Sequence, residues 1–204
     1  MSNFECYLFD LDGTLADTSK LVLQSLYETI CRYTNVRPIK NILKAYIKQS
    51  PKRTLRKYGV NDLSIYWQIY DNNIALAKFY FDDTKKILQK LIEKDSTLGV
   101  VSSLPEKQIA KILARLSIND LFDTIIGWRF GTRKKPHPDP ILDALKETGA
   151  EAEKTVYIGD TGDDVIAAKN AGVCSVFVTW SHPVLPYNVE PDFIIDHISE
   201  LISI

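Results

Sequence analysis

Short apolar runs recur along the chain, and most of them are followed directly by polar or acidic residues. Runs that are apolar at nearly every position are typical of strands buried on both faces of a parallel sheet. The pattern therefore predicts a mainly parallel sheet whose strands end in polar segments. The predicted strands span residues 4–9, 97–101, 124–127, 154–158, 174–179 and 193–195.

Amphipathic helices are predicted between these strands. Apolar residues recur at helical spacing in residues 84–94 and 106–116, and shorter patterns of the same kind surround Ile141 and Val165. Strands that alternate with helices form right-handed βαβ units, which build an open sheet with helices on both faces. We therefore expect an α/β fold with a doubly wound, mostly parallel, Rossmann-like sheet.

Residues 16–82 interrupt this alternation with a long stretch of helical pattern. Pro38 and Pro51 separate predicted helices there, as proline commonly does. An all-helical segment directly after the first strand predicts a cap inserted into an α/β core of residues 1–15 and 83–204. The predicted cap helices span residues 18–33, 38–48, 51–58 and 62–80.

Polar side chains that can take part in catalysis or ligand binding follow several predicted strands at their carboxyl ends. Ligands bind at this edge of open parallel sheets, so residues far apart in the chain are expected to meet there. Three or more carboxylates at one edge repel one another and need a cation. Oxygen ligands without histidine or cysteine suit Mg²⁺ better than zinc. The residues concerned are Asp10, Asp12, Gly13, Thr14, Ser102, Ser103, Lys135, Asp160 and Asp164.

Such a cluster is suited to phosphoryl transfer. A bound Mg²⁺ attracts phosphate, and a lysine with hydroxyl donors completes a site for the phosphate oxygens. One aspartate can act as a nucleophile and form an aspartyl-phosphate. A second carboxyl group two residues further on, the spacing of Asp10 and Asp12, can protonate the leaving oxygen and then activate water. Gly13 suits the tight turn that such a loop requires.

Four short segments carry these residues in chain order. They read DLDGTL at 10–15, VVSS at 100–103, KKPHPDP at 134–140 and GDTGDD at 159–164. Together they resemble the four motifs of the haloacid dehalogenase-like (HAD) hydrolases, and the resemblance covers nearly the whole chain. The helical segment after the first motif resembles the cap of the subfamily that contains phosphoglycolate phosphatases, pyrophosphatases and β-phosphoglucomutase.

The resemblance implies a role for each matched residue. Asp10 would be the nucleophile and a Mg²⁺ ligand. Asp12 would be the general acid and base, with its main-chain carbonyl on the metal, and Asp160 would be a further metal ligand. Ser102 would bind the phosphoryl group, and Lys135 would offset the charge of the nucleophile and the phosphate.

The remaining motif residues have supporting roles in the same resemblance. Asp164 would support the metal shell or Lys135, and Ser103, Gly13 and Thr14 would add contacts to the phosphate. The role of Asp163 stays open, since it falls on a variable position of the motif.

Simpler structural roles are alternatives for some of these features. Asp160 could be the N-cap of the helix that follows it. An aromatic cluster on the last predicted cap helix is expected to be cap core rather than a substrate platform. That cluster comprises Tyr66, Trp67, Tyr70, Phe79, Tyr80 and Phe81.

The charge of the chain is balanced as a whole but unevenly distributed. The 25 Lys and Arg residues and 26 Asp and Glu residues give a formal net charge of -1, unlike a protein that coats nucleic acid or an anionic membrane. Nine of the bases lie between Arg32 and Val60, where no acid occurs, so the rest of the chain is acidic. This run is either a solvated helix face or, in part, a surface that attracts an anionic substrate; Arg53 and Arg56 are the candidate contacts.

Other features favour a cytoplasmic protein whose partner is a small phosphorylated metabolite. No apolar run reaches the roughly 20 residues of a transmembrane helix. Cys6, Cys31 and Cys174 are odd in number and far apart, as is usual for reduced thiols. No nucleic acid or membrane partner is expected, and the oligomeric state stays open.

The favoured function is a Mg²⁺-dependent phosphatase of the phosphoglycolate phosphatase type. A β-phosphoglucomutase-like phosphomutase is the main alternative, although the predicted cap lacks the Gly-rich, Arg-containing loop of that enzyme. A non-catalytic binding module is a lesser alternative. Dehalogenation is disfavoured because Asp12 is present, whereas phosphonate cleavage stays open because the cap is rich in lysine.

Overall fold

The computed structural model describes residues 4–44, 50–181, 185 and 188–204. The chain divides into two compact units, one formed by Met1–Asp17 with Phe79–Ile204 and the other by Thr18–Lys78. We call these the α/β unit and the helical unit. In the described part of the chain, no helix is both long and apolar enough to cross a membrane.

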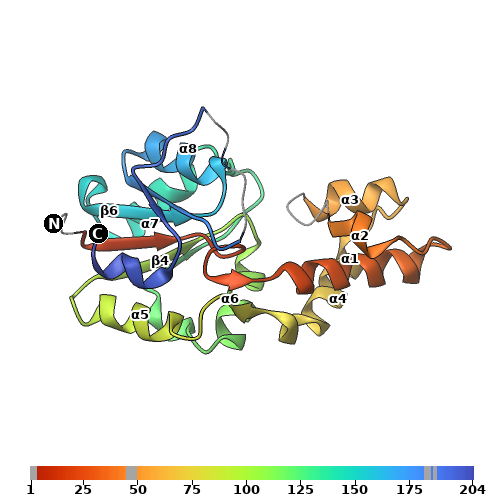
Figure 1. The fold of residues 1–204 in the computed structure, drawn as a ribbon. Coiled ribbons are helices and arrows are strands. Elements are labelled where there is room, and N and C mark those ends of the chain that lie inside the picture. The colour runs from red at the N-terminus through yellow and green to blue at the C-terminus, as the bar shows by residue number, and fades with distance from the viewer. Residues whose placement is uncertain (1–3, 45–49, 182–184, 186–187) are drawn as a thin grey trace. The chain divides into compact units, whose positions relative to one another are not determined.

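The α/β unit contains a six-stranded sheet in which every pairing is parallel, in the order β5-β4-β1-β6-β7-β8 (Figure 1). This order reverses direction at β1, which is the arrangement of a doubly wound sheet. The predicted fold class is therefore confirmed. The strands span Cys6–Phe9 (β1), Thr97–Val101 (β4), Thr124–Ile126 (β5), Thr155–Gly159 (β6), Cys174–Val178 (β7) and Phe193–Ile195 (β8), and the short strands β2 and β3 span Ala16–Asp17 and Lys78–Phe79.

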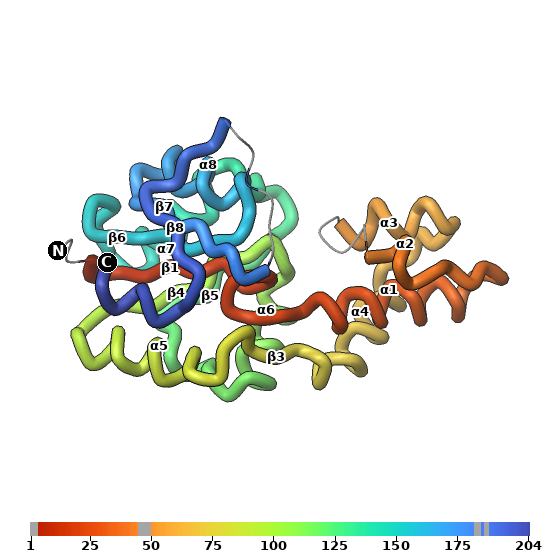
Figure 2. Tube along the Cα trace, in the orientation of Figure 1, coloured from red at the N-terminus to blue at the C-terminus, as the bar shows by residue number. Residues whose placement is uncertain are grey.

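Helices cover both faces of the sheet. On one face, Leu8 and Val101 of the sheet pack in a single core cluster with Ile141 of α7 and Ala168 of α8. On the opposite face lies α5 (Figures 1 and 2). The helices of this unit are α5 (Thr84–Ile92), α6 (Glu106–Arg115), α7 (Asp139–Thr148) and α8 (Gly162–Ala171), with short 3₁₀ turns at Asn119–Leu121, Ala152–Lys154 and Ile198–Ile202.

The strand register brings the polar segments to one edge. Phe9 of β1 lies opposite Val100 of β4 and Ile158 of β6, so the chain leaves these three strands at the same level. The amide of Asp10 still donates to the carbonyl of Ile158 (2.8 Å), which fixes the start of the loop after β1. The central strands therefore deliver their following residues to a common site.

The helical unit has an apolar core of its own. Leu26 and Ile30 of α1 are fully buried, as are Leu55 of α3 and Tyr66 and Tyr70 of α4. The rings of Tyr66 and Tyr70 lie 5.8 Å apart, so this part of the aromatic cluster is core. The helices are α1 (Ser19–Tyr33), α2 (Lys40–Lys44), α3 (Pro51–Lys57) and α4 (Leu63–Asn72), followed by a 3₁₀ turn at Ile74–Leu76.

The predicted helix over residues 62–80 is too long. The helix ends at Asn72, and Asn73 is its C-cap. Asparagine side chains compete for backbone hydrogen bonds and disfavour helix interiors, so the run of Asp71 and two asparagines stops the helix. Phe79, predicted to lie on this helix, instead belongs to β3.

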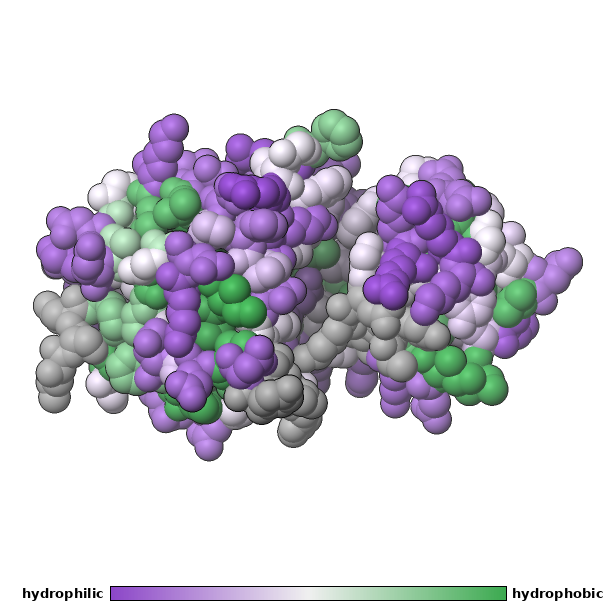
Figure 3. Space-filling model, turned by 90° about the horizontal axis from the view of Figure 1, so that it is seen from above, coloured by the Kyte–Doolittle hydropathy of each residue, from purple (hydrophilic) through white to green (hydrophobic). Residues whose placement is uncertain are grey.

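The basic run lies largely on the surface of the helical unit. Arg53 and Arg56 are exposed, while Lys40 folds back so that its Nζ lies 3.1 Å from the Gln24 side-chain oxygen and over the ring of Tyr27. Hydrophilic residues cover much of this unit in the view of Figure 3. Residues 45–48 of the predicted helix 38–48, including Lys48, are outside the described residues.

Two leucines of α7 provide a test of how far the core on this face stabilises the fold. Leu145 is 8% exposed and Leu142 is 45% exposed. Leu145→Ala is expected to lower the free energy of unfolding by about 2–4 kcal/mol, because it leaves a cavity under the sheet. Leu142→Ala is the matched control and is expected to cost less than about 0.5 kcal/mol. Urea denaturation measures both losses, and equal losses would contradict the burial of Leu145 in the core.

Candidate active site

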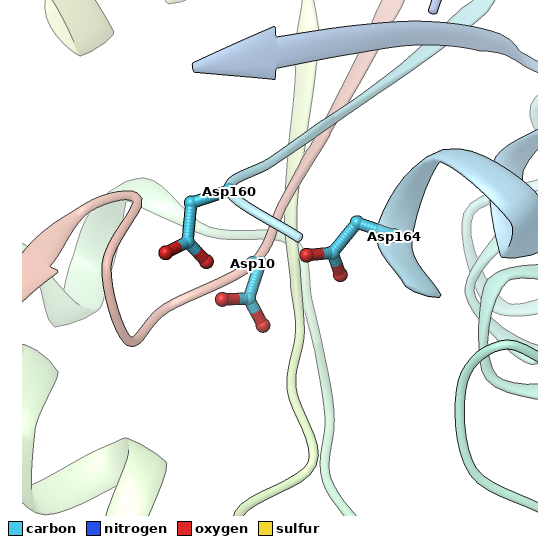
Figure 4. Close-up of side chains that lie close together, drawn as sticks. All are labelled: Asp10, Asp160 and Asp164. Carbon is cyan, nitrogen blue, oxygen red and sulfur yellow. The ribbon is translucent and has the colours of Figure 1, made fainter. Parts of the chain in front are cut away.

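Three buried aspartates converge at the carboxyl edge of the sheet. Asp10 follows β1, Asp160 follows β6, and Asp164 lies in the first turn of α8 (Figure 4). One carboxylate oxygen from each lies within 4.8 Å of the others. Their exposed fractions are 7%, 2% and 2%, respectively. These residues, predicted from two motifs far apart in the chain, therefore share one site.

Lys135 joins this cluster from the loop before α7. Its side chain is only 6% exposed, and its Nζ donates to Asp10 Oδ1 at 2.7 Å and to Asp164 Oδ1 at 2.6 Å. Burial alone would lower the pKa of Lys135, but the attraction of Asp10 and Asp164 outweighs it and holds that pKa well above its usual value. The lysine is therefore a fixed positive charge that orients two carboxylates.

The negative charge of the site exceeds what Lys135 balances. Burial raises the pKa of Asp10 well above its usual value; Lys135 counteracts this rise, whereas Asp164 and Asp160 add to it. A cation among the three carboxylates would favour the ionised form of Asp10. The donors are all oxygen atoms, the ligands that hard divalent cations prefer. The buried aspartate cluster could therefore hold such a metal ion.

Tyr157 is a site residue that the sequence analysis missed. Its hydroxyl accepts a hydrogen bond from Lys135 Nζ (2.7 Å) and donates one to the carbonyl of Val101 (2.9 Å). Burial raises the pKa of Tyr157 well above its usual value, so the hydroxyl stays protonated and can donate. Its position inside an apolar predicted strand could have indicated this role, because a buried tyrosine hydroxyl needs a hydrogen-bond partner.

The N-cap of α8 is Thr161, not Asp160. The Thr161 side chain accepts from the amide of Asp164, and Asp164 Oδ2 accepts from the Thr161 amide (2.9 Å) and hydroxyl (2.6 Å). This reciprocal capping box fixes the Asp164 carboxylate, whose other oxygen faces Lys135. The alternative of Asp160 as a simple helix cap is therefore wrong, and its carboxylate accepts instead from Ser181 Oγ at 2.7 Å.

Two glycines make room for the carboxylates. Gly13 has a φ of +90°, and a Cβ there would collide with the carboxylate of Asp160. A Cβ at Gly159 would collide with the side chain of Asp164. Gly13 thus allows both the turn after β1 and the close approach of Asp160.

The other predicted residues lie around this cluster. Asp12 is half-buried in a loop closed by a hydrogen bond from the Gly13 amide to the Ala16 carbonyl (2.9 Å). Thr14 is buried, and its Oγ1 has no hydrogen-bond partner among the described residues. Ser102 is buried at the end of β4.

The structure does not bring every predicted residue to the cluster. Ser103 is exposed, as is Asp163 on α8. Arg53 and Arg56 belong to the helical unit.

Comparison with known proteins identifies the protein family to which this chain belongs. The model of the haloacid dehalogenase-like hydrolase family matches residues 7–178. The chain belongs to this family, which confirms the predicted family and the prediction of a hydrolase.

Curated relatives match the chain over nearly its whole length. Phosphoglycolate phosphatase from Aquifex aeolicus is 30% identical, over 97% of this chain and 94% of the relative. Pyrophosphatase PpaX from Oceanobacillus iheyensis is 29% identical over the same shares. A haloacid dehalogenase-like family hydrolase from Streptococcus pneumoniae has a similar structure, with a TM-score of 0.82 and 22% identity, covering 100% of this chain and 99% of its own; at that identity the likeness bears on the fold alone.

Tyr157 gives a test of the hydrogen bonds that hold Lys135. Tyr157→Phe is expected to lower the free energy of unfolding by about 1.5–3 kcal/mol, since it removes a hydrogen bond to a buried charge. Tyr7→Phe on the adjacent strand β1 is the control. Tyr7 is 4% exposed, and its hydroxyl has no hydrogen-bond partner in the described chain, so less than about 0.5 kcal/mol is expected. Urea denaturation of both variants measures the difference, and equal losses would argue against this role.

Proposed function

We propose that the protein is a Mg²⁺-dependent phosphatase that hydrolyses small phosphate compounds through an aspartyl-phosphate. The observation that carries this proposal is Asp10, a buried carboxylate held by Lys135 beside Asp160 and Asp164. The names of the relatives, phosphoglycolate phosphatase and pyrophosphatase, support a small phosphorylated substrate.

Asp10 and Asp160 would hold Mg²⁺ through their carboxylates, and Asp12 through its main-chain carbonyl. When bound, the ion neutralises excess negative charge and attracts the phosphate oxygens. The cluster suits this role because its three carboxylates lie together, and Lys135 pairs with two of them, Asp10 and Asp164.

Asp10 is the proposed nucleophile. A carboxylate oxygen attacks phosphorus, a bond forms between Asp10 and phosphorus, and the bond from phosphorus to the leaving oxygen breaks. Asp12 gives its proton to that leaving oxygen. Lys135 orients Asp10 through its 2.7 Å contact and offsets charge on the phosphoryl oxygens.

Water then completes the reaction. Asp12, now ionised, takes a proton from a water molecule, whose oxygen attacks the phosphorus of the aspartyl-phosphate. The bond between Asp10 and phosphorus breaks, which releases phosphate and restores both aspartates.

Phosphate contacts are assigned to residues around this centre. Ser102 and Lys135 line a common pocket and are the main candidates. Gly13, Thr14 and Ser103 would add to them. We further propose that the helical unit acts as a cap, in which Arg53 and Arg56 remain candidates for contact with an anionic substrate.

Substitution of the motif aspartates tests the chemistry. Asp10→Asn is expected to lower kcat by more than about a thousandfold, because an amide is no nucleophile here. Asp12→Asn is expected to lower it by about 10²–10⁴-fold through loss of proton transfer. Asp163→Asn, at an exposed acid near the site, is the control and is expected to keep nearly full activity.

Phosphate release from pyrophosphate, phosphoglycolate and sugar phosphates, with and without Mg²⁺, is the measurement. Equal rates for the wild type and Asp10→Asn would reject the mechanism. Isomerised sugar phosphate as the product, in place of free phosphate, would favour a mutase.

Thermal unfolding tests the metal site without any turnover. Mg²⁺ at about ten times its Kd is expected to raise the Tm of the wild type by about 3–6 °C, because it binds only the folded cluster. Asp160→Asn should abolish this shift, whereas Asp163→Asn should retain it. A shift that persists in Asp160→Asn would place the ion elsewhere.

A further inference from the structure

A pocket beside the phosphate-binding end of the α/β unit is only partly used by the proposed hydrolysis. Its walls come from the segments that follow β4 and β5 and from the loop and first turns of α7. Ser102 and Lys135 belong both to this pocket and to the proposed phosphate site, so a group bound here would lie next to the phosphoryl group. The other lining residues are Ser103, Ile126, Gly127, Trp128, Arg129, Thr132, Arg133, Lys134, Pro140 and Asp143.

Two of the basic side chains in the pocket are already paired with acids. Arg129 Nε donates to Glu106 Oε1 at 2.7 Å. Arg133 forms an ion pair with Asp139 at 2.8 Å. Both guanidinium groups therefore offer less uncompensated charge to a ligand.

Lys134 differs from these arginines. Within the described ranges, no carboxylate lies within ion-pair distance of its ammonium, which stands 4.5 Å from the centroid of the Trp128 ring and 3.5 Å from the Ser103 carbonyl oxygen. Asp143, the acid among the lining residues, acts electrostatically on Arg129. Lys134 is thus a cation without a counterion, held over an aromatic ring.

Partial burial lowers the pKa of Lys134, with no acid acting against that effect. A partly desolvated ammonium gains more from an incoming anion than a fully hydrated one does. The ammonium group of Lys134 is therefore suited to bind an anion.

We propose that Lys134, with Trp128 and Ser103, forms a leaving-group subsite that binds a second anion of the substrate. This rests on the proposed function and narrows it to small phosphate compounds with an anion at each end. One phosphoryl group lies at Asp10, and a carboxylate or a second phosphate on the leaving group lies at Lys134.

Binding of unreactive probes tests this subsite. Isothermal titration calorimetry at fixed free Mg²⁺ compares methylenediphosphonate and phosphonoacetate, which carry a second anion, with methylphosphonate, which does not. Lys134→Met is expected to weaken binding of one or both of the first two probes by about tenfold or more, and that of methylphosphonate by less than about twofold. Whichever probe is weakened identifies the second phosphate or the carboxylate as the group recognised.

Two further variants control the experiment. Lys134→Arg keeps the charge and can keep the cation–π contact with Trp128, and it is expected to bind within about threefold of the wild type. Lys146→Met removes an exposed lysine of α7 that does not line the pocket and is expected to leave binding of all probes unchanged. Equal weakening of all three probes by Lys134→Met, or no weakening of any, would overturn the subsite. Because no turnover is measured, this result is separate from that of Asp10→Asn.

Discussion

The structure of the site depends on one buried ammonium group. Lys135 has three N–H donors, and the carboxylates of Asp10 and Asp164 and the hydroxyl of Tyr157 accept them at 2.6–2.7 Å. A buried charge without partners costs several kcal/mol, so these groups stabilise one another only when all are in place. The ends of β1 and β6, the first turn of α8 and the loop before α7 are therefore tied to one geometry.

This constraint explains why small residues and capping groups surround the site. The acids must approach one another closely, and at Gly13 and Gly159 any side chain would occupy the space of a carboxylate. The capping box of Thr161 holds Asp164 in the rotamer that meets Lys135. Ser181 donates a hydrogen bond to Asp160, so backbone shape and hydrogen bonds position acids that would otherwise repel one another.

Structural features that depend on local or periodic patterns could be predicted from the sequence. Buried parallel strands read as apolar runs, and residues at their carboxyl ends meet at one edge, which is why Asp10, Asp160 and Lys135 could be placed together in advance. Tyr157 was not placed with them, because it lies inside β6 rather than after its carboxyl end, so the rule that locates the other residues does not reach it. The end of α4 at Asn72 was predicted too late for another reason. The apolar pattern continues past Asn72, and it does not reveal that asparagine side chains compete for the backbone hydrogen bonds of a helix.

Two adjacent lysines show how the same residue type can serve two sites. The backbone turns the 6%-exposed Lys135 toward buried carboxylates, where it orients the proposed nucleophile at the reacting end of the substrate. Lys134 points to the pocket, where the ring of Trp128 holds it without neutralising it. A cation paired with carboxylates acts at the reacting centre that those carboxylates form, whereas a cation without a carboxylate partner can bind a second anion outside that centre. Spacing alone cannot separate these roles, because they depend on which acids lie within reach of each ammonium group.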